Sequence, residues 1–296
     1  MKLRIATRSS AQASTQAGAV ASALEAAGHR CELVLVDTQG DRTQAAGVPL
    51  HTIGGQGVFT KEIQLAVLDG RADLAVHSAK DLPTVPHPGL VIGAFTERRT
   101  AADALIGGTL ATLPFGATVA TGSVRRRAQI GRARPDLTFA ELRGNIGTRL
   151  ERIPDGGAIV MAVAALEVLG LIQSIGAQHT WEVLDPLEFV PAIGQGCVAV
   201  EHRADDRSVA AAVAAIDHLP TRYAVTVERA FLGELGSGCT LPVGAHVRGG
   251  RLHVFLAGEA SGVVVSERFD LTGDHADDVD TARAAAQATL ATVSGG

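Results

Sequence analysis

The sequence predicts an α/β protein with two sheet-and-helix units and a smaller α+β domain at its carboxyl end. Three observations lead to this fold class. Short apolar strands alternate with helical segments along the first two thirds of the chain, which is the rhythm of βαβ units with a parallel sheet. The 34 glycines indicate many tight loops between these segments. Further on, three alternating strands follow one another beside helices, which is typical of an α+β domain.

The first unit begins almost at the amino terminus. Its strands alternate with two helices, and the alanine-rich helix 12–27 ends at a glycine, as helices often do. A segment with three prolines, 82–89, interrupts the rhythm before the last strand. The predicted elements are strand 3–7, helix 12–27, strand 31–36, helix 59–68, strand 72–76 and strand 90–95.

The second unit repeats the rhythm after a polar segment, 97–102, that we expect to cross between the units. We expect the glycine turn and strand at 194–201 to join the first unit, so that the chain would cross between the two units twice. The predicted elements of the second unit are strand 118–121, helix 124–133, strand 137–140, helix 145–153, strand 158–163 and helix 164–169. In the last domain they are helix 221–235, strands 241–247, 252–257 and 262–269, and helix 277–292.

The bulk composition excludes several classes of protein. With 26 basic and 31 acidic residues the net charge is −5, which disfavours nucleic-acid binding through overall charge. No apolar run is long enough for a membrane span, and the amino terminus has no leader-like apolar core, so we expect a cytoplasmic protein. The three cysteines, Cys31, Cys197 and Cys239, are widely spaced, which argues against a disulfide framework and a zinc site.

One stretch is loaded with arginine although the chain is acidic overall. It holds three acids and no lysine. Guanidinium groups form paired hydrogen bonds with carboxylates and phosphates, so this stretch predicts a polyanionic ligand. Phosphate, nucleic acid and carboxylate all remain open at this point. The arginines are Arg125, Arg126, Arg127, Arg132, Arg134, Arg143, Arg149 and Arg152.

Placement separates these arginines into two groups. Ligands of open α/β units bind at the carboxyl ends of strands, where loops meet helix amino termini. Arg125, Arg126, Arg143 and Arg149 follow predicted strands and are expected to bind the ligand, whereas the other four are expected on solvated helix faces. Further polar residues follow predicted strands in both units. They are Arg8, Ser10, His77, Ser78, Lys80, Asp81, Thr121, Ser123, Gly144 and Asn145.

Two single residues have competing interpretations. Asp81 in HSAKDLP is a paired loop residue or turn cap, or it handles a cationic intermediate and moves protons in an arginine-lined cleft. Cys239 in LGSGCTLPVG is a buried apolar residue, the usual fate of a free cysteine, or an accessible thiol in a glycine-flanked loop. The residues alone leave both questions open.

A co-linear series of blocks resembles the hydroxymethylbilane synthase (porphobilinogen deaminase) family. The resemblance runs from near the first residue to about residue 250, and the order of so many specific blocks makes chance an implausible explanation. The blocks are RIATRSS (4–10), GGQGVFTKE (54–62), HSAKDLP (77–83), TGSVRRRAQ (121–129), LRGNIGTRL (142–150), AIVMAVAALEVLGL (158–171), PAIGQGCVAVE (191–201) and GSGCTLPVGAH (236–246).

The resemblance implies a fold and an activity. Two periplasmic-binding-protein-like α/β domains would surround a cleft: residues 1–96 with about 195–216 as domain 1, and 100–192 as domain 2. Residues 219–296 would form the smaller α+β domain 3. The family joins four porphobilinogen molecules, releasing ammonia at each addition, on a dipyrromethane primer linked to the cysteine that matches Cys239. We expect a monomer that uses porphobilinogen and binds neither nucleic acid nor membrane.

The resemblance also implies residue roles. Asp81 matches the catalytic aspartate, which would stabilise the positive charge on pyrrole nitrogens and help to move a proton. Cys239 matches the cofactor attachment site. Residues that would contact the cofactor are Ser78, Lys80, Thr121, Ser123, Arg125, Arg126, Arg143 and Gly144. Residues that would contact the substrate are Arg8, Ser10, Arg149 and Gln195.

Two departures from the family pattern stand out. Gln56 occupies a position where many members have a lysine. The segment around Ser174 lacks an arginine that many members carry there, so carboxylate binding by this region is in doubt. Two rival functions are a non-catalytic anion-binding protein and an arginine-rich nucleic-acid binder. The first gives Cys239 no purpose, and the second predicts steep salt dependence and no covalent adduct.

Overall fold

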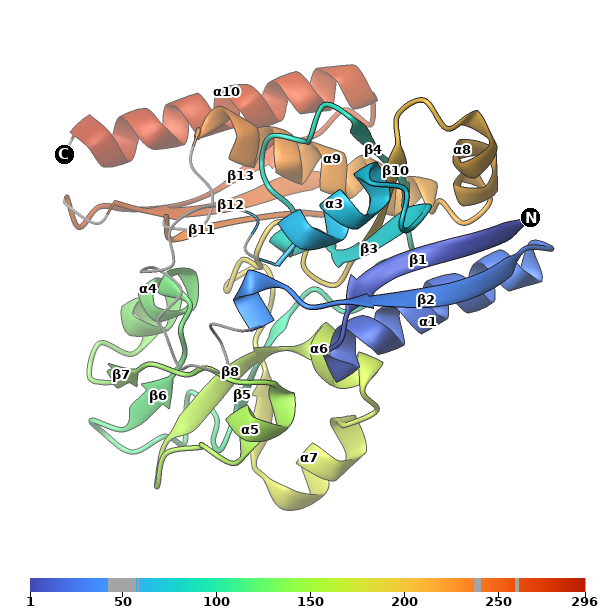
Figure 1. Cartoon of the computed structure of the whole chain (residues 1–296). Coiled ribbons are helices and arrows are strands. Elements are labelled where there is room, and N and C mark those ends of the chain that lie inside the picture. Colours follow the sequence, from blue (N-terminus) through green and yellow to red (C-terminus); the bar gives the residue numbers. More distant parts are fainter. Residues whose placement is uncertain (42–56, 58, 237–240, 259–260, 296) are drawn as a thin grey trace.

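The computed structural model describes residues 1–41, 57, 59–236, 241–258 and 261–295, and its strands form three sheets. Figure 1 shows the sheet of β1–β4 and β10 beside the sheet of β5–β9, with the third sheet lying along helices α9 and α10. The predicted fold class, two α/β units and a smaller α+β unit, is confirmed. Each sheet draws its strands from one of the three predicted domain ranges, but the domain boundaries themselves stay a prediction.

The first sheet has the strand order β2-β1-β3-β10-β4. β1 runs parallel to β2 and β3, whereas β10 runs antiparallel to β3 and β4. Side chains alternate between the faces of a strand, so Ile5 packs with helix α1 and Ala6 with helix α3. The elements are β1 (Lys2–Arg8), α1 (Ala11–Ala26), β2 (Arg30–Val36), α3 (Lys61–Leu68), β3 (Leu74–Ser78), β4 (Leu90–Phe95), β10 (Val198–Arg203) and α8 (Arg207–Ala214).

The second sheet has the order β7-β6-β8-β5-β9 and repeats this plan. β6 is parallel to β7 and β8, whereas β5 is antiparallel to β8 and β9. The elements are β5 (Asp103–Ile106), β6 (Thr118–Ala120), α4 (Val124–Ala133), β7 (Thr138–Ala140), α5 (Ile146–Leu150), β8 (Ala158–Ala162), α6 (Val163–Val168), α7 (Ile172–Gln178) and β9 (Trp181–Val183).

The parallel pairing expected from the βαβ rhythm is present in both sheets, but each sheet also contains antiparallel pairs, and the reason lies in the crossings. β5 follows the first crossing directly, and β10 follows the second. A chain that arrives from the other unit enters its new sheet from the opposite end, so each crossing contributes one antiparallel strand. The predicted return of the segment 194–201 to the first unit is confirmed by the pairing of β10 with β3 and β4. β5, β9, α7 and α8 are elements that the sequence pattern did not predict.

The third unit stacks two helices on a three-stranded antiparallel sheet in the order β11-β12-β13. Phe231 of α9 and Ala286 of α10 share one apolar core with Val254 of β12. The elements are α9 (Leu219–Glu234), β11 (Val243–Arg248), β12 (Arg251–Ala257), β13 (Val264–Asp270) and α10 (His275–Gly295).

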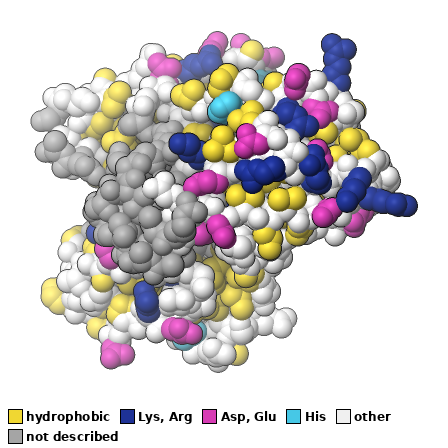
Figure 2. Space-filling view, in the orientation of Figure 1, with side chains coloured by type: hydrophobic (Ala, Val, Ile, Leu, Met, Phe, Trp, Pro, Cys, Tyr) yellow, Lys and Arg dark blue, Asp and Glu magenta, His cyan; other side chains and the backbone are white. Residues whose placement is uncertain are grey.

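The surface is mixed in charge. On the face shown in Figure 2, basic and acidic side chains are interspersed over the first unit rather than gathered by sign. Among the helices that the structure describes, none is long and apolar enough to cross a bilayer.

Candidate active site

Two hollows lie where strands of the first and second sheets end. The arginine pocket is lined by Phe59, Thr121, Gly122, Ser123, Arg126, Leu142, Arg143, Gly144, Arg149 and Val160. The aspartate pocket is lined by Arg8, Ala13, Gln16, Phe59, Thr60, Ile63, Val76, His77, Ser78 and Asp81. Phe59 lines both, so the two pockets are neighbours and together form one candidate site between the first two units.

Helix caps set the backbone of the arginine pocket. Ser123 precedes α4, and its Oγ accepts a hydrogen bond from the Arg126 amide at 3.4 Å. Asn145 precedes α5, and its Oδ1 accepts from the Thr148 amide at 2.9 Å. Gly144 has φ +121°, a conformation that an L side chain rarely adopts, so a glycine is required there. Both helices therefore begin beside the pocket, and the cap of each one satisfies an amide of its first turn.

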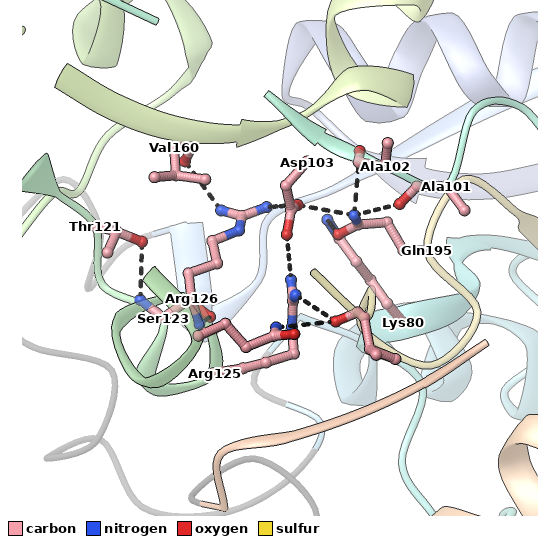
Figure 3. Close-up of polar contacts among 12 residues, drawn as sticks. Lys80, Ala101, Ala102, Asp103, Thr121, Ser123, Arg125, Arg126, Val160 and Gln195 are labelled. Atoms are coloured by element: carbon pink, nitrogen blue, oxygen red, sulfur yellow. Dashed lines mark hydrogen bonds and ion pairs between the residues drawn. The ribbon is translucent and has the colours of Figure 1, made fainter. Parts of the chain in front are cut away.

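Asp103, at the start of β5, pairs with two consecutive arginines of α4 (Figure 3). Its Oδ2 lies 2.8 Å from Arg125 Nη2, and its Oδ1 lies 2.7 Å from Arg126 Nη2. Arg125 also donates to the Val190 carbonyl at 2.8 Å, and Arg126 donates to the Val160 carbonyl at 3.0 Å. Burial alone would raise the pKa of Asp103, but the two guanidinium charges hold that pKa well below its usual range.

Gln195 joins the same network at the crossing between the units. Its Nε2 donates to the Ala101 carbonyl at 2.6 Å and to Asp103 Oδ1 at 2.8 Å (Figure 3). Its Oε1 lies 3.4 Å from Lys80 Nζ. The pKa of Lys80 is lowered to about 8, chiefly by burial; the charge of Asp81 opposes this effect and that of Arg126 adds to it. The side chain of Gln195 is only 1% exposed, and it connects the two crossing segments.

Arg143 and Arg149 lie in surroundings unlike those of Arg125 and Arg126. No carboxylate in the described part of the chain forms an ion pair with either of them, and Arg149 Nε donates to the Gly144 carbonyl at 2.8 Å. Burial, together with the nearby charges of Arg126 and Arg143, lowers the pKa of Arg149 to about 10. Burial also lowers the pKa of Arg143. This part of the pocket holds more positive charge than its described protein neighbours neutralise.

The aspartate pocket has its own ordered arginine. Arg8, at the end of β1, meets Asp41 through Nη2 and Oδ1 at 2.5 Å and through Nε and Oδ1 at 3.1 Å. Thr38 supports the pair, since its Oγ1 donates to Asp41 Oδ2 at 2.6 Å. The guanidinium of Arg8 lies 4.2 Å from the centre of the Phe59 ring, which is cation–π distance. Arg8 is thus fixed before any ligand arrives.

Asp81 is the half-buried carboxylate of this pocket. It ends the short 3₁₀ turn Ala79–Asp81, which follows β3 directly. Ser78, beside it, donates from Oγ to Gln16 Oε1 at 3.1 Å, which joins β3 to α1. Phe59 lines both the arginine pocket and the aspartate pocket that contains this carboxylate.

Of the fourteen predicted site residues, twelve fall into three groups. Six lie in the arginine pocket: Thr121, Ser123, Arg126, Arg143, Gly144 and Arg149. Three lie in the aspartate pocket: Arg8, Ser78 and Asp81. Arg125, Lys80 and Gln195 belong to the network around Asp103, and Ser10 caps α1 by accepting from the Ala13 amide at 3.4 Å. Cys239 and Gln56 lie outside the described residues.

Of the four arginines expected on solvated helix faces, Arg132 and Arg152 are exposed, and Arg127 forms a partly exposed ion pair with Glu141. Arg134 differs, because it caps the end of α4, pairs with Asp136 and donates to the Leu113 carbonyl at 3.1 Å. The sequence reasoning missed Asp103, Asp41 and Phe59. Asp103 had a detectable signal, because a single charged residue at the start of an apolar strand requires a buried partner. Asp41 and Phe59 are brought to Arg8 from segments far along the chain, and no local pattern shows this.

The fold and the site define a two-lobed α/β protein with an arginine-lined pocket and a carboxylate beside it. The family described as porphobilinogen deaminase, dipyromethane cofactor binding domain, matches residues 3–211. The porphobilinogen deaminase of Moorella thermoacetica is 47% identical over 252 residues, covering 83% of this chain and 78% of its own. That of Nitratidesulfovibrio vulgaris is 45% identical over 252 residues, covering 83% and 77%. The chain belongs to the porphobilinogen deaminase family.

Among solved structures, the methionine binding protein MetQ aligns with 72% of this chain and 88% of its own, at 12% identity and a TM-score of 0.44.

Proposed function

We propose that this protein is a hydroxymethylbilane synthase, a transferase that joins four porphobilinogen molecules stepwise and releases ammonia at each addition. The observation that carries the proposal is a pocket with unneutralised arginines beside a single carboxylate, Asp81. Porphobilinogen bears an acetate and a propionate, so the growing chain is a polycarboxylate that can neutralise those arginines. Its reacting centre becomes cationic, which suits a carboxylate.

A dipyrromethane primer on Cys239 fits the residues of the arginine pocket. Such a primer bears two carboxylates on each of its rings. Arg143 is positioned to bind one of them, because its charge has no ion-pair partner among the described residues, and Arg126 lines the same pocket with its charge shared with Asp103. The capped start of α4 adds the Ser123 hydroxyl. When bound, the primer would supply the nucleophilic pyrrole carbon.

The protein's own groups would then do three things. Arg8, held by Asp41 and Phe59, would orient a carboxylate of the incoming porphobilinogen. Asp81 would face the pyrrole N–H groups and stabilise positive charge as ammonia leaves. The same carboxylate would accept a proton and pass it on as the new bond forms. Arg149, with its pKa near 10, stays charged at neutral pH and keeps the pocket cationic.

The proposal includes an organisation for the chain. We infer domain 1 from residues 1–96 and about 195–216, domain 2 from 100–192 and domain 3 from 219–296, acting as a cytoplasmic monomer. Domain 1 would provide Asp81, domain 2 would provide most of the carboxylate-binding residues, and domain 3 would provide Cys239.

The experiment that tests the function is the intact mass of the purified protein with an assay of porphobilinogen consumption. We expect a mass above that of the bare chain by one dipyrromethane, mapped to Cys239 by peptide analysis, and a pink reaction with an aldehyde reagent for pyrroles. The Cys239→Ser protein is the control and should lack both the added mass and activity. An unmodified mass for active wild-type protein would rule the proposed chemistry out.

A further inference from the structure

The loop that carries Asp81 has few backbone hydrogen bonds, although Ala79 and Leu82 pack in an apolar cluster with Phe95. It runs from the end of β3 to the start of β4 and includes Pro83, Pro86 and Pro88. Proline has no N–H group, so a proline-rich loop cannot form a regular ladder of backbone hydrogen bonds. Near Asp81 the backbone hydrogen bonds are those from Ala79 N to Cys197 O at 2.9 Å and from Leu82 N to Ala79 O at 3.3 Å. The position of the carboxylate therefore depends on side chains from outside the loop.

One such side chain holds the far end of the loop. Arg229 lies on α9, in the third unit, and its Nη2 donates to the Pro83 carbonyl at 2.8 Å and lies 3.5 Å from the Thr84 carbonyl. This contact joins residues 146 positions apart. Burial lowers the pKa of Arg229, and the charge of Glu201 opposes that effect. A guanidinium is thus kept half-buried next to the loop.

A second group holds the near end. Glu201 lies on β10, and its Oε2 is 3.1 Å from His77 Nε2; both side chains are 2% exposed. This approach is an electrostatic contact and not an aligned hydrogen bond. Gln64 Nε2 donates to the same Oε2 at 2.9 Å, which fixes the carboxylate. His77 is the last residue but one of β3, immediately before the Asp81 turn.

The charges of Glu201 and Arg229 influence each other. Burial raises the pKa of Glu201, but His77 and Gln64, with Arg229 further away, lower it overall. Glu201 and Arg229 come from different elements, β10 and α9, and their opposite charges attract each other. The chain thereby places a buried negative group at one end of the loop and a positive group at the other.

We propose that Glu201 and Arg229 are positioning residues that hold the two ends of the loop 77–84 and so fix Asp81 in the cleft. This inference rests on the proposed function in one respect, because it takes Asp81 as the catalytic carboxylate. It adds a consequence: helix α9, which leads to the segment of Cys239, also sets the place of Asp81. A shift of about 1 Å in a catalytic group can reduce turnover by on the order of a hundredfold.

The chain offers a matched control on the same helix. Arg222 also lies half-buried on α9 and also donates to a backbone carbonyl of the first unit, from Nη2 to Gly93 O at 2.8 Å. It holds β4 rather than the loop of Asp81. Arg222 also forms an ion pair with Asp217, so replacing it removes at least as many contacts as replacing Arg229. A general loss of stability would therefore affect the Arg222 variant no less than the Arg229 variant.

The test compares Arg229→Met with Arg222→Met by turnover and by hydrogen exchange. We expect Arg229→Met to lower kcat by about 10- to 100-fold with KM changed less than threefold, and to speed exchange in peptides covering 79–85. Arg222→Met should leave kcat within about twofold and speed exchange near residue 93 instead. Arg229→Lys, which keeps one donor for Pro83 O, should recover most of the loss. Glu201→Gln should speed exchange at 77–81.

Failure of the positioning role can be distinguished from failure of the proposed function. Equal falls of kcat in the two methionine variants, or unchanged exchange at 79–85 in Arg229→Met, would overturn the positioning role. Should Arg229→Met not fold, the polar but uncharged pair Arg229→Gln and Arg222→Gln gives the same comparison. The exchange measurement does not need turnover, so it reports on the loop even if Asp81→Asn proves active and the catalytic assignment fails.

Discussion

Helix α4 and the segment 143–149 contribute arginines to the same pocket, but their electrostatic surroundings are opposite. Arg125 and Arg126 of α4 share Asp103, which the structure buries with them. Arg143 and Arg149 pair with no carboxylate among the residues described, and their pKa values are lowered chiefly by burial. The charges of Arg125 and Arg126 are balanced in part by Asp103. Arg143 and Arg149 have no such counter-charge in the described part of the chain, and an anionic ligand can supply it.

The difference shows how one run of arginines can serve both structure and binding. A buried ion cluster contributes little net stability, but removing one partner leaves an uncompensated charge and is costly. An under-neutralised cation has the opposite behaviour: it costs stability in the free protein and contributes affinity for an anion. Substitutions in the two groups should therefore separate stability from binding.

The largest expected effect is on stability, from Asp103→Asn. This change leaves two buried guanidinium groups without their shared counter-charge, and we expect the free energy of unfolding to fall by about 3–5 kcal/mol. Urea unfolding followed by circular dichroism measures it. Glu141→Gln, which removes the exposed partner of Arg127, is the control and should change stability within experimental error. A loss below about 1 kcal/mol for Asp103→Asn would contradict the prediction, because it would mean that the two arginines do not depend on the charge of Asp103.

Arg149→Met should produce the converse result. Removing this charge relieves repulsion from Arg126 and Arg143, so thermal stability in primer-free protein should stay the same or rise. Loss of a carboxylate contact should raise KM for porphobilinogen by about 10- to 100-fold, because a charged hydrogen bond is worth about 1.5–3 kcal/mol. Arg127→Gln is the matched surface control, with KM within about twofold. A clear fall in stability with unchanged KM would place Arg149 in the structural group.

The smallest predicted effect is a pH dependence from Lys80. Its pKa of about 8 in the free protein lies below the ordinary lysine value, so the folded state binds fewer protons than the unfolded state between about pH 8 and 10.5. Stability of primer-free protein should rise with pH in that window. Affinity for porphobilinogen should fall by up to about tenfold between pH 7 and 9, as the ammonium is lost. Calorimetric titration of Cys239→Ser protein measures this, and the added Lys80→Met change should flatten the profile.

Much of the fold could be predicted because most of its signals are local. Helix α4 occurs over the predicted residues 124–133, where a serine cap and an amphipathic pattern coincide. β5 and β9 were missed because they are short, and nothing in the two segments shows that they pair with each other. The antiparallel insertion of β10 and β5 depends on the path of the whole chain, which strand patterns do not contain.

The candidate site was predicted less completely, for a related reason. Strand ends and glycines indicated Arg126, Arg143, Gly144 and Arg149, and the structure places all of them in one pocket. The commitment of Arg125 to Asp103 depends on a contact between separate elements. Periodicity shows where a side chain stands on its own element, but not which charge another element brings to it.

The double crossing has a consequence for how this chain is made. The second sheet possesses all its strands once residue 183 has left the ribosome, but the first sheet lacks the strand between β3 and β4 until residue 203 emerges. Domains usually fold in the order of synthesis. Here the amino-terminal unit must wait, with the edges of β3 and β4 unpaired, while the unit encoded after it is completed. The strand that finally fills the gap also brings Glu201, so the loop of Asp81 obtains its support only at that late stage.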